Sequence, residues 1–430
     1  MKIATILIAI CFSLCANGQS LSQEINKTKT LLHFDTPETL DASLDALVAQ
    51  IGDKRIVALG EDTHGTKEFY ELRAAITKKL IQEKGFNLVI LENPYEDLEA
   101  LSQNLQTQPI DSLIKTHLFS IYQTESMKNF LQWLQTYNQT HTPIVFKGCD
   151  DSYRELLPEM ISIELKSNIT PEMTNILKEF HERVTVEASD FYVKYPDKKP
   201  VKIDNYGYYR EVYRLILQLE KEIKKENSSS KYLDELLLNA KNSYINYEMI
   251  YTGKIITRDI VMAERVAFFA KDPKAKIIVW AHNAHISKEV IIDNEIGLMG
   301  RNLKQEFPNE YVAIAMSSFS GSYSHIKKRL INDDHDYGDQ LYEANYPTPP
   351  ANTFEEKLGQ NTSEAYYFHI NQNIQKSCAQ LPKQKLKLFG YGMNDEKDYY
   401  EVNPALMYDY VVFVKKTNAT KPLFNYEQKK

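Results

Sequence analysis

Acidic, basic and imidazole side chains follow four apolar runs of the sequence, at the point where each run ends. The first run leads into Glu61 and His64, the second ends at Glu92, and the third is followed by Asp150. The fourth leads into the string HNAH at positions 282–285. In an open parallel sheet the carboxyl ends of the strands share one edge, and ligands bind in the crevice outside that edge. We therefore predict one site built from these side chains.

Water activation is the chemistry that suits these residue types. A histidine flanked by carboxylates can act as a general base, and the sequence contains no GxSxG nucleophile elbow. We predict that His64 is the base and that a carboxylate near it holds its tautomer, as the acidic member of a hydrolytic triad does. In the HNAH string, His282 directly follows the apolar run and is favoured as a second acid or base, whereas His285 could equally pack or cap.

Arg73 gives a second, independent indication of a site. On a helix beginning at Thr66, Arg73 falls within about 50° of the centre of the apolar stripe. A buried guanidinium is costly unless a carboxylate meets it, and Glu61 and Glu92 are the nearest candidates. The alternative is a side chain whose stem packs while its head reaches water. We predict pairing, with Arg73 fixing a carboxylate or stabilising an oxyanion.

Substrate contacts and metal ligands complete the predicted site. We assign substrate binding to Asp150 and Asn283, although an acidic residue after a strand is as often a helix N-cap. Three histidines with nearby acids could ligate zinc. However, the sequence has no HExxH, and an arginine within the cluster opposes a neighbouring cation. We predict no metal and no cofactor.

The elements that must position these residues are short apolar strands alternating with helices. Helical patterns cover Thr66–Lys84 and Ser126–Tyr137. Apolar strands that alternate with helices predict an α/β fold, with a mostly parallel central sheet flanked by helices. The predicted strands are Arg55–Gly60, Phe86–Glu92, Pro143–Gly148, Lys276–Ala281, Tyr311–Ser317, Leu386–Gly390 and Tyr410–Lys415.

A long charged stretch interrupts this alternation and predicts a helical insertion over one edge or end of the sheet. Its long helices are Asn205–Glu226 and Lys231–Ile250, joined by a turn at 227–230. The stretch Ile331–Thr353, rich in Asp, Tyr and Pro, predicts a loop or flap. The predicted division is a signal peptide at 1–18, the first part of the core at 19–152, the insertion at 153–255 and the second part of the core at 256–430.

The N-terminal residues have the pattern of a signal peptide. Lys2 precedes an apolar run, and Ala16-Asn17-Gly18 offers small residues for cleavage. The run is too short to cross about 30 Å of hydrocarbon, so we expect an exported protein, periplasmic or secreted. After cleavage Cys149 and Cys378 remain. They could pair, but Cys149 ends a strand and suits a buried small residue better.

Composition excludes several classes of protein. The chain has 430 residues, 43% of them hydrophobic and 25% charged, which excludes wholesale disorder. Its net charge of 51 − 58 = −7 argues against sequence-independent binding of nucleic acid. Neither GxxxxGK[ST] nor GxGxxG occurs. We expect a monomer that acts on a small molecule, with no nucleic-acid partner and no membrane partner after signal cleavage.

The same residues resemble the erythromycin esterase family over nearly the whole mature chain, about 30 to 420. The strings GExxHG and WAHNAH, in that order and at that distance, are specific to the resemblance. It rests mainly on Gly60-Glu61-Asp62-Thr63-His64-Gly65-Thr66, Gly148-Cys149-Asp150, Arg258-Asp259 and Val279-Trp280-Ala281-His282-Asn283-Ala284-His285.

The resemblance implies an α/β hydrolase without a serine nucleophile. Characterised members open the macrolide lactone ring and need no obvious metal. The implied functional residues are Glu61, His64, Arg73, Glu92 and His282 or His285, with His64 as the water-activating base. One departure is Asp62, where the family pattern has a small residue. Its charge either favours protonation of His64 or faces away from it.

Three hypotheses follow. The first is an exported hydrolase of ester or lactone bonds, macrolide rings included, that uses water activated by His64. The second is a metal-dependent hydrolase or lyase built on the same strand ends. The third is a protein that binds a glycoside or polyketide without turnover. The abundant tyrosines, 28 in all, suit such ligands because each offers an apolar face and a polar tip.

Overall fold

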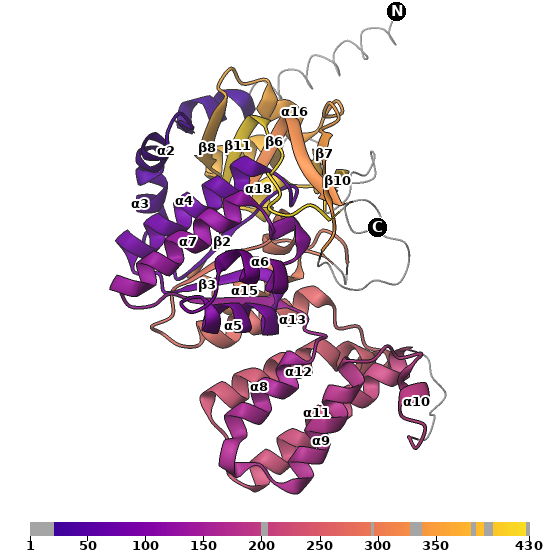
Figure 1. The fold of residues 1–430 in the computed structure, drawn as a ribbon. Helices are drawn as coiled ribbons and strands as arrows, with labels where there is room; N and C mark the ends of the chain where they lie inside the picture. Colours follow the sequence, from indigo (N-terminus) through magenta and orange to yellow (C-terminus); the bar gives the residue numbers. More distant parts are fainter. Residues whose placement is uncertain are drawn as a thin grey trace, which may run out of the picture.

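The computed structural model describes residues 21–198, 205–293, 296–326, 338–379, 384–390 and 399–426, and the predicted signal peptide lies outside these ranges. Figure 1 shows a sheet with helices on both faces and a helical bundle that projects from one end. None of the helices in the described ranges combines the length and apolar character needed to cross a membrane.

The central sheet is mostly parallel and has nine strands in the described part of the chain. Its order is β1-β8-β11-β6-β2-β5-β3-β4, and β7 pairs with β6. Every pair from β11 to β4 along this path is parallel, and β1–β8, β8–β11 and β6–β7 are antiparallel. The strands are β1 Thr30–Leu31, β2 Ile56–Leu59, β3 Leu88–Pro94, β4 Val145–Asp150, β5 Ile277–Trp280, β6 Tyr311–Ile326, β7 Leu341–Asn345, β8 Ala365–His369 and β11 Tyr410–Thr417.

Two apolar cores cover the two faces of the sheet, because successive strand residues point to opposite sides. Val57 and Leu59 of β2 belong to one core, with Leu72 of α4. Ile56 and Ala58 belong to the other, with the helices that follow the insertion. The first face is covered by helices from the N-terminal part of the chain: α2 Pro37–Ser43, α3 Asp45–Ile51, α4 Lys67–Lys84, α5 Tyr95–Asn104, α6 Ile110–His117 and α7 Glu125–Thr140.

The helices after the insertion pack on the second face or connect its strands. They are α13 Arg258–Ala270, α14 Asn283–Ile286, α15 Leu298–Glu306, α16 Phe354–Gly359, α17 Gln372–Ala379 and α18 Pro404–Met407. The predicted α/β fold, with a largely parallel sheet covered on both faces, is confirmed.

The predicted helical insertion is a bundle with its own apolar core (Figure 1). The turn between its two long helices falls at the predicted place, and Asn227 there has a positive φ of 51°. Burial of Met173, Ile216 and Leu236 holds three of its helices together. The bundle consists of α8 Leu156–Leu165, α9 Pro171–Val184, α10 Phe191–Lys194, α11 Asn205–Lys225 and α12 Lys231–Met249.

Two of the element predictions are wrong. The run Leu386–Gly390 contributes to no strand of the central sheet. Instead β9 (Gln384–Lys387) pairs with β10 (Tyr399–Val402) in a separate two-stranded sheet. The predicted flap at 331–353 contains β7, which pairs with the end of β6 because β6 continues for 16 residues, past its partners β2 and β11. Residues 331–337 of that stretch lie outside the described ranges.

Both cysteines of the predicted mature chain are unpaired and buried. Cys149 is fully enclosed at the end of β4, as predicted for a small apolar residue. Burial raises the pKa of the Cys149 thiol well above its ordinary value, which keeps the sulfur protonated and unreactive.

Candidate active site

The predicted site residues lie in a row along the carboxyl edge of four neighbouring strands. β2, β5, β3 and β4 are adjacent in that order. Glu61 and His282 each follow the end of their strand, β2 and β5, by two residues. Glu92 lies near the end of β3 and Asp150 is the last residue of β4, so positions far apart in the sequence become neighbours. The carboxyl edge of a parallel sheet is where ligands bind in open α/β folds. The sheet order therefore assembles the row that the sequence predicted.

Glu61 bridges His64 and Arg73. Its Oε1 accepts a hydrogen bond from Nδ1 of His64 at 3.0 Å, and its Oε2 accepts one from Nη2 of Arg73 at 2.6 Å. Glu61 and Arg73 are completely buried, and His64 is 5% exposed. With the proton on Nδ1, the second nitrogen of His64, Nε2, is the basic one. Glu61 thus fixes the tautomer that a general base requires.

Arg73 is held in place by the carboxylate and by two aromatic rings. Its guanidinium lies 4.7 Å from the centre of the Tyr70 ring and 5.0 Å from that of Trp280. Burial disfavours the charge, but Glu61 outweighs it and raises the pKa of Arg73. The predicted pairing of Arg73 with a carboxylate is confirmed. Because Arg73 is fully enclosed, it can position Glu61 but cannot touch a substrate.

Two glycines shape the loop that carries Glu61 and His64. At Gly60 an added Cβ would lie 2.1 Å from Oδ1 of Asn283, and at Gly65 it would lie 1.8 Å from the carbonyl oxygen of Ser324. No side chain fits at either distance. The backbone N–H of Ser324 donates to the carbonyl of Gly65 at 2.8 Å. The glycines let the loop pack directly against the HNAH segment and β6.

Glu92 and Asp150 share a cation that the sequence prediction did not assign. Arg258, at the start of α13, donates from Nε to Asp150 at 2.7 Å and from Nη2 to Glu92 at 2.9 Å. Asp150 caps no helix, because α8 begins only at Leu156. The side chain of Arg258 is 42% exposed, so it is the part of this group that a ligand can reach. Substrate binding by Asp150 itself stays a prediction.

His285 lies between two carboxylates. Its Nε2 is 3.2 Å from Oε1 of Glu92, and its Nδ1 contacts Oδ1 of Asp259. Burial lowers the pKa of His285, but these two carboxylates outweigh it and raise the pKa to about 10. Burial alone would raise the pKa of Glu92, yet His285 and Arg258 hold it well below its usual range. His285 is therefore an imidazolium at neutral pH.

His282 is neutral and occupied at both ring nitrogens. Its Nε2 donates to the carbonyl of Phe389 at 2.8 Å, and its Nδ1 accepts from the N–H of Ala284 at 3.3 Å as the cap of α14. Burial, with the neighbouring His64 as a further cause, lowers the pKa of His282 to about 3. The rings of His64 and His282 are 5.1 Å apart. This geometry favours a positioning role for His282 over the acid or base role predicted for it.

Asn283 faces the sheet. Its Nδ2 donates to the carbonyl of Met316 at 2.8 Å, and its Oδ1 accepts from the N–H of the same residue at 3.2 Å. The side chain is buried, so a ligand could reach the amide only by breaking this pair. The structure thus places Asn283 as a link between α14 and β6. The substrate contact predicted for it finds no support in this geometry.

Asp62, which departs from the family pattern, faces away from His64. This is one of the two alternatives that the sequence left open for its charge. Its Oδ2 lies 3.0 Å from Nζ of Lys387 and accepts a hydrogen bond from the N–H of Ser318 at 2.8 Å. Both members of this ion pair are 1% exposed. Burial raises the pKa of Asp62, and Lys387 acts against that rise. The extra carboxylate is therefore neutralised on the far side of the loop.

Arg258 and Asp259 are the site residues whose roles the sequence prediction missed. They belong to one of the strings that carry the family resemblance, which is the signal that could have identified them. Asp259 accepts hydrogen bonds from the N–H groups of Gly297 and Leu298 at 2.9 Å, at the start of α15. Anchored there, it orients His285.

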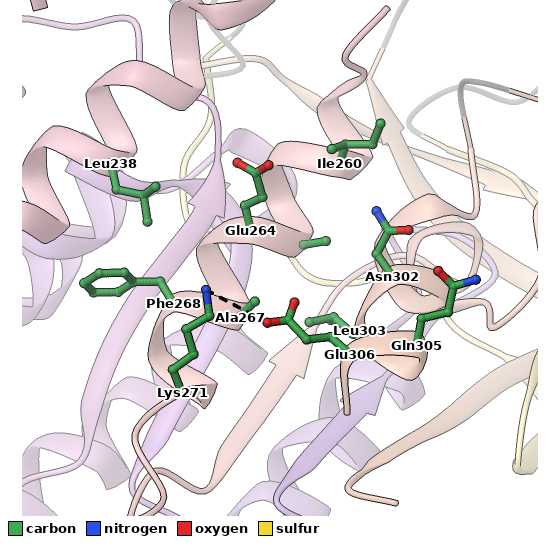
Figure 2. Close-up of a pocket in the computed structure, with 11 residues that line it drawn as sticks. Leu238, Ile260, Glu264, Ala267, Phe268, Lys271, Asn302, Leu303, Gln305 and Glu306 are labelled. Atoms are coloured by element: carbon green, nitrogen blue, oxygen red, sulfur yellow. Dashed lines mark ion pairs between the residues drawn. The ribbon is translucent and has the colours of Figure 1, made fainter. Parts of the chain in front are cut away.

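Neither a metal site nor the groove along α13 and α15 contains the predicted chemistry within the described part of the chain. No group of three His, Cys, Asp or Glu side chains within the described ranges is arranged to hold a metal ion. A groove of about 660 Å³ runs along α13 and α15. Lys271 and Glu306, which form an ion pair at 3.9 Å, are among its lining residues (Figure 2). None of the predicted site residues is among the described residues that line it. The histidine–carboxylate chemistry therefore lies elsewhere, at the strand ends.

The fold and the site together define a class: an α/β protein with a histidine–carboxylate site, lacking a serine elbow, at the carboxyl edge of its sheet. The sequence profile of the family described as erythromycin esterase matches residues 81–417, which is most of the chain. The chain belongs to the erythromycin esterase family. The GExxHG string at 60–65 precedes the matched range.

Individual relatives agree with this assignment. The chain is 26% identical over 363 residues to the Escherichia coli protein named erythromycin esterase type II, covering 76% of this chain and 83% of that protein. A crystal structure of a Bacillus cereus protein superposes with a TM-score of 0.74 at 19% identity, over 95% of this chain and 99% of that one. A mutant of the erythromycin esterase EreC in its open conformation gives a TM-score of 0.66 at 16% identity, over 93% and 98%. At these identities the two structures show a shared fold.

Proposed function

We propose that this protein hydrolyses ester or lactone bonds with water activated by His64. The observation that carries the proposal is Glu61, which binds Nδ1 of His64 with one oxygen and Arg73 with the other. Membership of the erythromycin esterase family supports a hydrolase. Macrolide lactones are the first substrates to test, because that is the activity the resemblance implies.

In the proposed reaction, His64 takes a proton from water and later gives it to the departing alkoxide. Nε2 of His64 takes a proton from water as the oxygen attacks the carbonyl carbon. The tetrahedral oxyanion forms near the positive charges of Arg258 and His285, which are fixed before the reaction by Glu92, Asp150 and Asp259. The imidazolium of His64 then protonates the departing alkoxide. The products are a carboxylic acid and an alcohol, joined in one molecule when the substrate is a lactone.

The test compares purified wild-type protein with His64→Ala and Glu61→Gln on a panel of macrolides and simple esters, with mass spectrometry detecting the added water. We expect His64→Ala to lose at least about 100-fold in rate and Glu61→Gln to lose rate as well. His181→Ala, a histidine on α9 of the insertion, is the matched control and should hydrolyse normally. Activity that persists in His64→Ala contradicts the mechanism, and no hydrolysis of any substrate contradicts the function.

We further propose export, which rests on the pattern of residues 1–18 alone. Expression of the full chain in a bacterial host, followed by fractionation and determination of the mature N-terminus, tests it. A mature chain that begins near residue 19 in the periplasm or medium supports export. An uncleaved chain in the cytoplasm contradicts it.

A further inference from the structure

A second pocket, of about 350 Å³, lies where the helical insertion meets the end of the row of site residues. α11 and α12 of the insertion supply Tyr206, Tyr209, Asn242 and Tyr247, and Arg258 of α13 completes it on the side of the sheet. Arg258 also contacts Glu92 and Asp150. One guanidinium therefore borders both this pocket and the proposed catalytic group. A pocket of this volume is near the lower end of the range for small-ligand sites, about 300–1,000 Å³.

Aromatic rings form much of the lining. The ring centre of Tyr247 lies 5.0 Å from that of Tyr209 and 5.9 Å from that of Tyr206. Tyr153, which also lines the pocket, lies 6.5 Å from Tyr209. Tyr206 is 49% exposed, although a side chain of this size is usually covered. A tyrosine offers an apolar face for a ring and a hydroxyl for a hydrogen bond, so the lining suits a ligand with both kinds of surface.

Two residues of the lining each carry a buried polar atom that has no hydrogen-bond partner within the described chain. Asn242 is 5% exposed, and its Nδ2 has no hydrogen-bond partner among the described residues. The same holds for Oγ1 of Thr257 within the described chain. Buried polar groups in native proteins are nearly always hydrogen-bonded, so each exception requires an explanation. Both atoms are covered by the protein, so acceptors on a bound molecule would reach them only after the lining side chains adjust. The amide nitrogen and the hydroxyl can then each donate.

The charges of the pocket are already compensated within the protein. Arg258 is paired with Asp150 and Glu92, and Asp151 accepts from Arg265 at 2.9 Å and from the hydroxyl of Tyr153 at 3.0 Å. An ionic ligand would meet no unbalanced opposite charge here. The chemistry therefore favours a neutral molecule that has an apolar face and several hydroxyl groups, which describes a sugar ring.

We infer that this pocket binds a neutral pyranose ring of the substrate, while the ester or lactone carbonyl attached to it reaches His64. The inference rests on the proposed function, which accounts for the ester or lactone group of the substrate. It adds that the rest of the substrate contains a pyranose ring. It assigns the helical insertion to recognition, with Tyr206, Tyr209 and Tyr247 against the ring and Asn242 and Thr257 bonded to its hydroxyls.

Binding is measured first, by saturation-transfer NMR of the full chain with the methyl pyranosides of glucose, galactose and mannose. Cyclohexylmethanol, a ring of similar size without the ring hydroxyls, is the matched control ligand. We expect saturation transfer to the ring protons of at least one pyranoside, reduced at least fivefold in Asn242→Leu and Tyr206→Ala. Tyr251→Ala, which is 46% exposed and is not among the residues that line the pocket, should leave the transfer unchanged.

Some outcomes overturn the inference. They are no transfer to any pyranoside, equal transfer to cyclohexylmethanol, or transfer that Tyr206→Ala does not reduce. If Asn242→Leu fails to fold, Tyr206→Ala decides the question, because the exposed position of Tyr206 makes a folding defect unexpected.

Hydrolysis separates this inference from the proposed function. The substrates are the primary acetate of the pyranoside that binds best and cyclohexylmethyl acetate. We expect kcat/KM to favour the sugar acetate at least fivefold, and Tyr206→Ala to reduce that ratio while Tyr251→Ala does not. Equal hydrolysis of both acetates overturns the sugar pocket and leaves the hydrolase standing. Pyranoside binding without hydrolysis of any ester keeps the pocket and overturns the hydrolase.

Discussion

Two histidines three positions apart differ in charge in this site: His282 is neutral and His285 is protonated. His282 is enclosed by a carbonyl and an amide and has a pKa lowered to about 3, whereas His285 lies between two carboxylates and has a pKa raised to about 10. Burial opposes the charge on both residues, so the difference comes from their partners. The same residue type therefore supplies a neutral helix cap in one case and a fixed positive charge in the other.

The charge on His285 makes stability depend on pH in a defined window. The unfolded residue has a pKa near 6.5 and the folded one about 10, so the folded state binds the proton more tightly. The stabilisation is complete below about pH 6.5 and is lost as pH rises toward 10. We expect the free energy of unfolding to fall across this window in the wild type, measured by urea denaturation at several pH values.

The control for this prediction is His285→Gln, which removes the titrating group but can still hydrogen-bond. The fall in stability between about pH 6.5 and 10 should be smaller in the variant than in the wild type. Glu92 and Asp259 have lowered pKa values, so their titration changes the free energy of unfolding only at acidic pH, outside this window. The guanidinium of Arg258, 3.3 Å from Nε2 of His285, keeps its charge throughout the window. Parallel curves for the two proteins would contradict the prediction.

Sequence analysis predicts site residues well where the determining pattern is local. The burial of Arg73 follows from helical periodicity over a few turns, and its partner Glu61 lies only 12 residues before it. The role of His282 depends on the carbonyl of Phe389, 107 residues later, which no local pattern reveals. Asp259 lies in the first turn of a helix, where acidic residues are common for other reasons. Apart from the family resemblance, no local pattern therefore reveals its part in the site or that of Arg258.

Among the elements, the end of β9 and the residues that follow it hold in place the loop that carries Glu61 and His64. The N–H of Phe389 donates to the carbonyl of Asp62 at 2.8 Å, and the carbonyl of Phe389 accepts from His282. Lys387 forms the buried ion pair with Asp62 and lies 3.9 Å from the centre of the Tyr346 ring. One segment thus joins the loops that carry His64 and His282.

Removal of the Lys387 charge should destabilise the fold. We expect Lys387→Met to cost about 3–5 kcal/mol, because Asp62 is left as an uncompensated buried charge. The double variant with Asp62→Asn should cost less than the sum of the single variants. Urea denaturation measures each free energy of unfolding. Lys385→Met, at an exposed position of the same strand, is the control and should change little. Strictly additive effects would contradict the coupling.

The strands that position the site were predictable, and the strands around them were less so. β2, β3, β4 and β5 are apolar runs bounded by turn residues, because both faces of a parallel sheet are buried. The run at Leu386–Gly390 has the same character, but composition does not tell which sheet a strand joins. β7 has one buried residue, Leu341, and its other residues are half-buried or exposed. Its partner is an extension of β6 that no boundary signal marks.

At the scale of the whole molecule, a buried lysine connects the insertion to the core. Lys147 of β4 is 7% exposed and forms ion pairs with Glu99 of α5 and Glu235 of α12. The hydroxyl of Tyr95 also donates to Glu235, at 2.6 Å. A single ammonium group therefore contacts two carboxylates from two different packing units.

Loss of this ammonium should loosen the insertion. We expect Lys147→Met to cost about 3–5 kcal/mol, because two buried carboxylates are left without a cation, and to speed hydrogen exchange along α12. Hydrogen-exchange mass spectrometry measures the effect. Lys231→Met is the matched control on α12, since its pair with Asp272 is exposed and should contribute at most about 1 kcal/mol. Unchanged exchange in α12 of Lys147→Met would contradict the prediction.

The ion pair between Arg258 and Asp150 ties together the two places where the chain leaves the core and returns to it. Asp150 is the last residue of β4, and Arg258 is the first of α13. The chain between these two residues forms the insertion and carries most of the lining of the second pocket. It leaves the sheet and returns to it at positions that this ion pair holds together. A donor segment of different length would therefore have to span the same short gap and keep a carboxylate opposite Lys147. The strand ends would then keep their chemistry while the chimera acquired another selectivity.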